Sequence, residues 1–372
     1  MLNLPLFRTR VTRTLENTHN IMREITFAAA INEAIHETMD KDENVICYGL
    51  GVTDPKSVFD TTKGLEARFG GDRVFDMPTS ENAMTGIAIG AALDGIRPIV
   101  THQRLDFFLL AMDQLINSAS KWYYMFGCQQ SVPITIRLII GRGWGQGPTH
   151  SQNLQAWFAH MPGLKVVMPT TPEDAKGLLT ASILDPNPVV FLEHRWLHNA
   201  KGNVPEGFYS KPLGKARQAR EGADITIVSM SYMTIEALHA AEYLAEKGVD
   251  CEVIDLLTIR PLDWETVFES VKKTGKILAL DTGFTTGSVA GEIVARVAMD
   301  CFDSLTCKPA RLAMPDFPEP TSPALTKGFY VRAADIAAQV LEMMGKDSSS
   351  VKADLPEPTP HDVPGDWFKG PF

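Results

Sequence analysis

A carboxylate at the start of a helix of small residues is the most chemically suggestive feature of this sequence. Glu81 follows a short apolar strand at 74–76 and begins a predicted helix in which Gly86 and Gly90 lie four positions apart. Glycines at that spacing allow another backbone to approach one face of the helix. An acidic residue at a helix N-terminus is favourable in itself, and the spacing alone favours that structural role. In the functional alternative, burial raises the pKa of the carboxyl, which then shares a proton with a ligand nitrogen.

A glycine-rich loop that ends in a histidine is the second candidate. Glycine occupies every second position from 141 to 147, after an apolar strand expected at 133–140, and His150 and Ser151 follow. Such a loop can approach a ligand closely and place an imidazole over a reacting carbonyl. The alternative is a surface loop in which Ser151 caps the next helix. The residues alone leave both interpretations open.

Other nucleotide and metal motifs are absent or incomplete. The sequence has no GxxxxGK[ST] segment, and the glycines at 141–147 do not follow GxGxxG spacing. His194 and His198 lie four residues apart, but no HExxH glutamate accompanies them, which favours structural or surface histidines. We therefore expect neither a phosphate-binding loop nor a zinc site at these positions.

The elements that must position these groups alternate between strand and helix. Strands are predicted at 45–48, 74–76, 96–101, 133–140, 164–168 and 188–193, and helices at 26–39, 81–93, 107–122 and 172–184. A second series of strands and helices begins at 224. Such alternation is typical of βαβ units around parallel sheets, so we predict an α/β fold.

The length of 372 residues suggests two domains. A stretch near 197–222 is rich in glycine and proline and lacks a long apolar run, which is typical of an interdomain connection. We divide the chain into an arm (1–21), a first α/β domain (22–205), a linker (206–222), a second α/β domain (223–345) and a proline-rich tail (346–372). The composition of the tail predicts a disordered segment. Its aromatic residues Trp367, Phe368 and Phe372 favour the alternative, a segment that docks on the body or on a partner.

The composition excludes several classes of protein. A hydrophobic fraction of 44% indicates a folded chain, and a net charge of −10 argues against a nucleic-acid surface. No apolar run approaches the roughly 20 residues needed to span a bilayer. The five cysteines form no CxxC pair, which favours a reducing compartment, and we predict the cytoplasm. Arginines in residues 1–21 make a transit peptide conceivable, but a simple arm, or a start at Met22, is the preferred interpretation.

Several stretches, in this order, resemble the beta subunit of the thiamine-diphosphate-dependent first component of 2-oxo-acid dehydrogenase complexes, of the pyruvate, branched-chain and acetoin types. The similar stretches are residues 22–27, 81–99, 111–119, 150–152, 162–167 and 255–263. The likeness covers about 22–345. It implies two three-layer α/β domains with mainly parallel sheets, a pyrimidine-binding transketolase-like domain followed by a transketolase C-terminal-like domain.

The resemblance assigns roles to individual residues. It implies that Glu81 binds the pyrimidine nitrogen of thiamine diphosphate and favours the tautomer that activates the thiazolium carbon. It implies that Phe107 packs on the pyrimidine ring, that Gln103 also contacts the cofactor, and that His150 acts near the reacting end of the substrate. Asp185 and Asn187 lie where the family has a structural potassium site. Ordinary core packing for Phe107 and a helix-ending turn at 184–188 remain the alternatives.

The family's magnesium and diphosphate motif is missing from this sequence. It is a Gly-Asp-Gly segment followed by an asparagine, and in the family it lies on the alpha subunit. The sequence contains no Gly-Asp-Gly. The resemblance therefore implies half an active site, completed by an alpha subunit that ligates Mg²⁺, in an α2β2 assembly.

Three segments, at 101–105, 142–146 and 315–320, depart from the family pattern. The first two introduce Arg104 and Arg142, which could recognise an anionic substrate or could be solvated surface charges. In the family, the third region helps bind a lipoyl acyltransferase. The main hypothesis is oxidative decarboxylation of a 2-oxo acid with acyl transfer to lipoamide. The alternative is a split transketolase-like, carboligating enzyme of a biosynthetic pathway.

Overall fold

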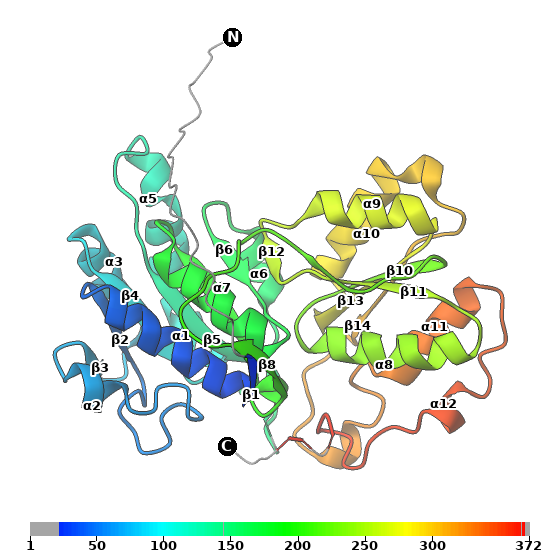
Figure 1. Ribbon diagram of the computed structural model, residues 1–372, viewed down its shortest axis with the longest axis horizontal. Helices are drawn as coiled ribbons and strands as arrows, with labels where there is room; N and C mark the ends of the chain where they lie inside the picture. The colour runs from blue at the N-terminus through cyan, green and yellow to red at the C-terminus, as the bar shows by residue number, and fades with distance from the viewer. Residues whose placement is uncertain (1–21, 144, 366, 369–372) are drawn as a thin grey trace, which may run out of the picture.

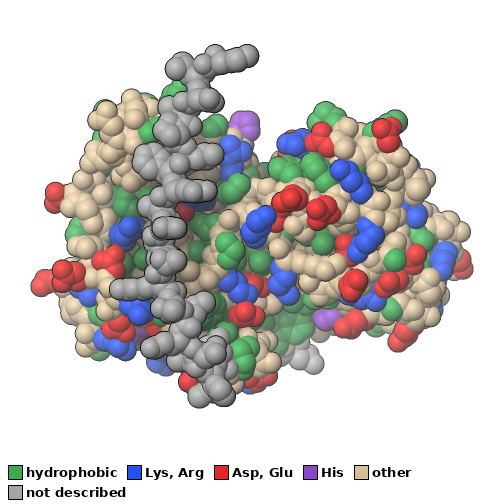
Figure 2. Space-filling view, turned by 45° about the horizontal axis from the view of Figure 1, so that its top comes forward, with side chains coloured by type: hydrophobic (Ala, Val, Ile, Leu, Met, Phe, Trp, Pro, Cys, Tyr) green, Lys and Arg blue, Asp and Glu red, His purple; other side chains and the backbone are tan. Residues whose placement is uncertain are grey.

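The computed structural model describes residues 22–143, 145–365, 367 and 368. Two α/β domains lie side by side, the first running from blue to green and the second from green to orange (Figure 1). The arm at 1–21 and Phe372 lie outside the described residues. On the face shown in Figure 2, acidic and basic side chains are interspersed. None of the helices in the described ranges is long and apolar enough to cross a membrane.

The first domain is built on a seven-stranded sheet in the order β12-β6-β7-β5-β4-β2-β3. All neighbouring strands are parallel except β12, which runs antiparallel to β6. The strands are β2 (Val45–Gly49), β3 (Val74–Asp76), β4 (Arg97–His102), β5 (Thr135–Ile140), β6 (Lys165–Val167), β7 (Val189–His194) and β12 (Thr258–Arg260). Because β12 comes from the second half of the chain, one sheet already joins the two domains.

Helices cover both faces of this sheet, as the resemblance implies. One buried cluster joins α1 and α7 to alternate residues of β2 and β7, and another joins α3 and α4 to β4 and β5. The helices are α1 (Phe27–Lys41), α2 (Leu65–Phe69), α3 (Glu81–Leu93), α4 (Leu105–Phe108), α5 (Ser120–Met125), α6 (Gln155–His160) and α7 (Pro172–Leu184). The continuous helix predicted at 107–122 is instead divided, with a 3₁₀ turn at Leu109–Ala111 and a π-helical segment at Gln114–Ala119 between α4 and α5.

The second domain has a five-stranded sheet in the order β14-β13-β10-β11-β9, parallel except for β9. Its strands are β9 (Arg217–Arg220), β10 (Ile225–Ser229), β11 (Cys251–Asp255), β13 (Ile277–Phe284) and β14 (Ala310–Met314). Its helices are α8 (Tyr232–Glu246), α9 (Trp264–Thr274), α10 (Val289–Asp300), α11 (Ala333–Met343) and α12 (Val351–Asp354).

The stretch predicted to connect the domains contains two short strands. β8 (Lys201–Pro205) pairs antiparallel with β1 (Met22–Thr26), and β9 becomes the edge of the second sheet. Alternation of apolar residues could not reveal these strands, because β1, β8 and β9 are mostly exposed or half-buried.

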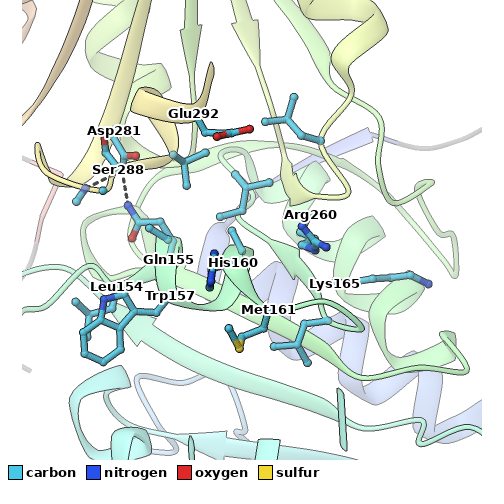
Figure 3. Close-up of a pocket in the computed structure, with 18 of the residues that line it drawn as sticks. Leu154, Gln155, Trp157, His160, Met161, Lys165, Arg260, Asp281, Ser288 and Glu292 are labelled. Atoms are coloured by element: carbon cyan, nitrogen blue, oxygen red, sulfur yellow. Dashed lines mark hydrogen bonds between the residues drawn. The ribbon is translucent and has the colours of Figure 1, made fainter. Parts of the chain in front are cut away.

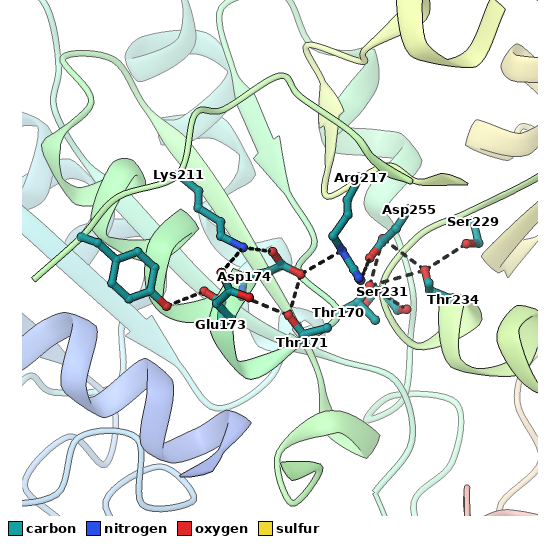
Figure 4. Close-up of polar contacts among 11 residues, drawn as sticks. Thr170, Thr171, Glu173, Asp174, Lys211, Arg217, Ser229, Ser231, Thr234 and Asp255 are labelled. Atoms are coloured by element: carbon teal, nitrogen blue, oxygen red, sulfur yellow. Dashed lines mark hydrogen bonds and ion pairs between the residues drawn. The ribbon is translucent and has the colours of Figure 1, made fainter. Parts of the chain in front are cut away.

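A buried polar network fixes the two domains against each other (Figure 4). Arg217 donates to Asp255 at 2.7 Å and lies 3.3 Å from Asp174 on α7. Thr170 also donates to Asp255, at 3.0 Å. Burial raises the pKa of Asp255 to about 6, and the Arg217 guanidinium opposes that rise. The linker thus supplies a cation that lies between a carboxylate of each domain.

The described part of the tail packs on the body, in contrast to the disordered segment that its composition predicts. Asp362 is fully buried and forms an ion pair with Arg142. Trp367 donates through Nε1 to the carbonyl of Trp196 at 3.1 Å, and the guanidinium of Arg195 lies over the ring of Phe368. The high content of proline and serine predicts disorder, but composition does not show whether single residues form a buried ion pair or anchor an aromatic ring.

Candidate active site

Three of the predicted cofactor-binding residues line one cleft. Glu81, Gln103 and Phe107 surround an open cavity of about 650 Å³, together with residues of the loops that follow β2 and β3. Glu81 begins α3, whereas Gln103 and Phe107 follow β4. The cavity therefore lies at the carboxyl ends of neighbouring parallel strands, where open α/β sheets bind their ligands.

Glu81 is held rigidly while its carboxylate stays available. The side chain is 5% exposed, and Thr85 donates to its backbone carbonyl at 3.0 Å. One turn along α3, the hydroxyl of Tyr48 donates to the carbonyl of Met84 at 2.8 Å, which fixes the helix against β2. Among the described residues, no side chain bonds to the Glu81 carboxylate. The group is thus placed to accept from, or share a proton with, a ligand nitrogen.

Two glycines and an aspartate shape the floor of the cleft. A Cβ on Gly49 would lie 2.0 Å from the carbonyl of Thr101, so only glycine permits this approach of β2 to β4. Gly51 has a positive φ of 76°, and a Cβ there would lie 2.5 Å from Nε2 of Gln103. Asp76 accepts from the amide of Val52 at 2.7 Å and so holds the loop that carries Gly51. Asp76 is not among the predicted site residues, although its place at a strand end shortly before Glu81 was a usable signal.

His150 packs against Phe107, one of the residues that line the cleft. The two rings meet edge to face, with centroids 5.2 Å apart and planes at 87°. Nδ1 of His150 lies 3.0 Å from the hydroxyl of Thr149, and among the described residues nothing bonds to Nε2. The structure thus brings together all four residues for which the resemblance implies a role at the cofactor or the reacting end of the substrate.

Two residues on α4 and just before it hold the histidine loop. Asp106 accepts from Nε2 of Gln152 at 2.9 Å, and Arg104 donates to the carbonyl of Gly141 at 2.8 Å. Arg104 also donates to the side-chain carbonyl of Gln146. Asp106 was missed by sequence reasoning because it forms no motif. It ties the loop to the segment that carries Phe107.

Arg104 and Arg142 are neither solvated charges nor groups directed at a substrate. Arg104 is 3% exposed, and burial lowers its pKa to about 10, against the opposing effect of Asp106 and Glu319. Arg142 is fully buried, and its donors are directed at Asp362 and two backbone carbonyls. Since both guanidiniums are satisfied within the chain, this arrangement does not support anion recognition by either.

The predicted potassium site is arranged as a turn. The carboxylate of Asp185 forms an ion pair with Lys165 and accepts from the amide of Asn187 at 2.9 Å. The ammonium of Lys165 therefore supplies the positive charge beside this carboxylate. The described residues also contain no cluster of three His, Cys, Asp or Glu suited to a metal. The contacts of the Asp185 carboxylate fit the helix-ending turn.

A larger groove of about 1380 Å³ lies between the two domains (Figure 3). Residues from α6 and the loop before it, such as Trp157 and His160, face Ser288 and Glu292 across it. The buried carboxylate of Asp281, whose pKa is raised by burial, accepts from the Gln155 side chain at its edge. This groove shares no lining residue with the Glu81 cleft. Of the two predicted catalytic residues, Glu81 lines the smaller cavity, and His150 contacts that cavity's Phe107.

Comparison with known proteins agrees with the two-domain α/β fold. Residues 23–200 match the transketolase pyrimidine binding domain, and residues 214–336 match the transketolase C-terminal domain. A solved structure described as a split gene transketolase, an inactive beta4 tetramer, superposes with a TM-score of 0.70 at 22% identity, over 86% of this chain and 99% of that one. At that identity the likeness shows the fold, and it confirms the predicted two-domain architecture.

Curated relatives are more similar in sequence. The beta subunit of acetoin:2,6-dichlorophenolindophenol oxidoreductase from Cupriavidus necator is 42% identical over 87% of this chain and 98% of its own length. The 2-oxoisovalerate dehydrogenase beta subunit of Bacillus subtilis is 40% identical over 87% of this chain and 99% of its own. The pyruvate dehydrogenase E1 beta subunit of Rhizobium meliloti is 42% identical over 86% of this chain and 70% of its own.

Proposed function

This chain belongs to the family of 2-oxo-acid dehydrogenase beta subunits, and we propose that it supplies the pyrimidine-binding half of a thiamine-diphosphate site. The observation that carries the proposal is the single cleft that joins Glu81, Gln103 and Phe107, with His150 against Phe107. The reaction is oxidative decarboxylation of a 2-oxo acid with acyl transfer to lipoamide. The split transketolase alternative is not favoured, because the relatives at 40–42% identity are dehydrogenase beta subunits.

The residues of the cleft fit the pyrimidine end of the cofactor. The Glu81 carboxylate, without a partner among the described residues, would hold the proton of a ring nitrogen, and the Phe107 ring would pack on the ring face. Gln103 offers an amide beside them. Thiamine diphosphate, when bound, supplies the nucleophilic carbon and the electron sink for decarboxylation. His150 would then stabilise charge, or move a proton, at the substrate oxygen.

The other half of the site must come from a partner. The sequence has no Gly-Asp-Gly segment, and Asp76, one of the acidic residues of the cleft, already accepts backbone and hydroxyl donors. We therefore assign Mg²⁺ and the diphosphate to an alpha subunit, in an α2β2 assembly. Large hydrophobic side chains are exposed on α3, on the 3₁₀ turn at Leu109–Ala111 and around the end of α5, namely Ile87, Leu110, Tyr123, Tyr124, Met125 and Phe126. Exposed side chains of this kind are common where a partner subunit binds.

The cellular compartment and a second partner, a lipoyl acyltransferase, complete the proposal. All five cysteines are free, which suits a reducing compartment such as the cytoplasm. A lipoyl acyltransferase is the further partner that the reaction requires, and the segment at 315–320 is the region to test for its binding.

Calorimetry on co-expressed subunits tests the half-site. We expect the pair formed with a candidate alpha subunit to bind thiamine diphosphate with Mg²⁺, and this chain alone not to bind it. Equally tight binding by the isolated chain would contradict the half-site. Dye reduction that depends on a 2-oxo acid, measured beside an aldehyde-acceptor assay, then separates dehydrogenase from carboligase activity.

A further inference from the structure

The guanidinium of Arg142 is committed to the C-terminal part of the chain. It is fully buried, and its Nε and Nη2 donate to one oxygen of Asp362 at 3.1 and 2.9 Å. Nη2 also donates to the carbonyl of Thr321 at 2.7 Å, and Nη1 donates to that of Pro320. Three of its nitrogens are thus bound to segments that come after the second sheet.

Arg142 begins the loop that carries His150. The loop follows β5 directly, and its far end is held by Asp106 through Gln152. A Cβ on Gly147 would lie 2.0 Å from the hydroxyl of Thr321, so the middle of the loop also packs on the segment that Arg142 binds. The amide of His150 in turn donates to the carbonyl of Gly147 at 3.0 Å. The position of the imidazole therefore depends on these C-terminal contacts.

The tail is itself anchored on both sides of Asp362. Nη2 of Arg332 donates to the carbonyls of His361 and Val363, each at 3.0 Å. Arg332 is buried and pairs with Glu236 of α8 at 3.2 Å. These bonds fix the backbone around Asp362, so its carboxylate is presented to Arg142 from a rigid support.

Because the Arg142–Asp362 ion pair is buried, we expect it to control the conformation of the loop that carries His150. Neither Arg142 nor Asp362 is exposed, and removal of one member of a buried ion pair leaves an uncompensated charge. If the Arg142 guanidinium has no carboxylate partner, opening of the loop lowers the free energy because water can then hydrate the charge. We propose that the tail at 356–365 is a strap, and that Asp362 is a positioning residue which holds the His150 loop closed through Arg142.

The relatives named above match at most 87% of this chain. Two of them are matched over 98% and 99% of their own lengths, so this chain is longer than those two proteins.

The catalytic part of the inference, that a loosened loop slows turnover, depends on the proposed function. The structural part does not, because the strap and the loop lie in one chain.

Hydrogen exchange of residues 141–152 in the assembled protein tests the strap without any assay of activity. In Asp362→Asn we expect the amides of this segment to exchange about tenfold faster than in the wild type. Asp354→Asn is the matched control, since Asp354 lies in the tail before the strap and pairs with Lys247 of the second domain. It should leave exchange in the loop unchanged.

Kinetics separate positioning from a general loss of structure. In Asp362→Asn we expect kcat to fall about 10- to 100-fold, with the half-saturating concentration of thiamine diphosphate unchanged, because the Glu81 cleft does not contact the tail. Loop exchange that responds as expected in a protein without 2-oxo-acid turnover would support the strap and contradict the proposed function.

A truncation after Leu355 combined with Arg142→Met removes the strap without leaving a buried charge. It should show the same acceleration of loop exchange, even if Asp362→Asn alone fails to fold. Wild-type exchange at 141–152 in this truncated variant, or equal acceleration in Asp354→Asn, would overturn the proposal.

Discussion

The ring of His150 stands edge-on to the ring of Phe107, with centroids 5.2 Å apart and planes at 87°. Phe107 also lines the Glu81 cleft, so one aromatic side chain contacts both the predicted cofactor site and the histidine loop. Edge-to-face pairs contribute about 0.5–1.5 kcal/mol beyond their buried area. Loss of this ring should therefore affect cofactor binding and histidine position together.

Phe107→Ala should raise the dissociation constant of thiamine diphosphate about tenfold and lower kcat by a further tenfold or so. Calorimetry and dye reduction on the assembled enzyme measure the two effects separately. Phe302→Ala is the control, since Phe302 is an aromatic residue of the second domain that is 71% exposed. A variant of Phe107 that lost binding while retaining kcat would show that His150 does not depend on this contact.

Glu81→Gln should remove the acid–base function while keeping the shape of the site. The amide has the same size, so α3 and the assembly should persist, but an amide cannot take up or release the proton of a ring nitrogen. We expect turnover to fall about 10²- to 10⁴-fold, measured by dye reduction beside size-exclusion chromatography of the complex. Glu66→Gln, at an exposed position of α2, is the control. Full activity in Glu81→Gln would refute the role assigned to Glu81.

Local patterns predicted the buried elements well. The helices at 81–93 and 172–184 and the strand at 74–76 have the bounds expected from the sequence. In α3 the buried residues follow the helical period, whereas α7 is buried on nearly all sides. The edge strands β8 and β9 and the break in the helix at 107–122 could not be predicted. Their course depends on partners distant in sequence, such as β1 and β11.

Some residues of the candidate site could be predicted from the sequence, and others could not. Glu81 and His150 carried a signal in residue type and spacing, and the resemblance added Gln103 and Phe107. Nothing local to Arg142 indicated burial, because its partner Asp362 lies 220 residues later in the chain. An isolated arginine in a glycine-rich loop has the same sequence pattern whether it binds a substrate or a buried carboxylate.

Removal of Arg217 should loosen the contact between the domains. Its guanidinium faces Asp255 and Asp174, which are 0% and 1% exposed. Arg217→Met leaves both carboxylates without this cation, and we expect a loss of about 3 kcal/mol in unfolding free energy at pH 8. The loss should be visible in urea titrations.

The same loss should be smaller at pH 5. Burial raises the pKa of Asp255 to about 6, above its ordinary value of 3.8, so its contribution to stability is present below 3.8 and is lost as the pH rises through about 6. Without Arg217 the pKa rises further, and at pH 5 the carboxyl is protonated and needs no cation. Arg296→Met, which breaks an exposed pair with Asp300, is the control and should change little. An equal loss at both pH values would contradict this assignment.

A buried glutamate behind the histidine loop should make stability fall as the pH rises through neutrality towards about 8. Glu319 is only 1% exposed. Burial raises its pKa to about 8, and the nearby Asp106 raises it as well, whereas Tyr330, Arg142 and Arg104 oppose the rise. The carboxyl is therefore mostly neutral at pH 7 and begins to ionise just above it.

The direction of the effect follows from linkage. Because the folded pKa of Glu319 lies above its ordinary value of 4.5, its contribution to stability is complete below 4.5 and is lost as the pH rises through about 8. Between pH 6.5 and 8 the unfolding free energy should fall by about 1–2 kcal/mol. Glu319→Gln removes the titration and should flatten this decline. Asp316→Asn is the control, because hydrogen bonds from Thr286 lower the pKa of the exposed Asp316 and place its titration in acid. Urea titrations across this range decide the matter, and a decline that persists in Glu319→Gln would assign it to another group.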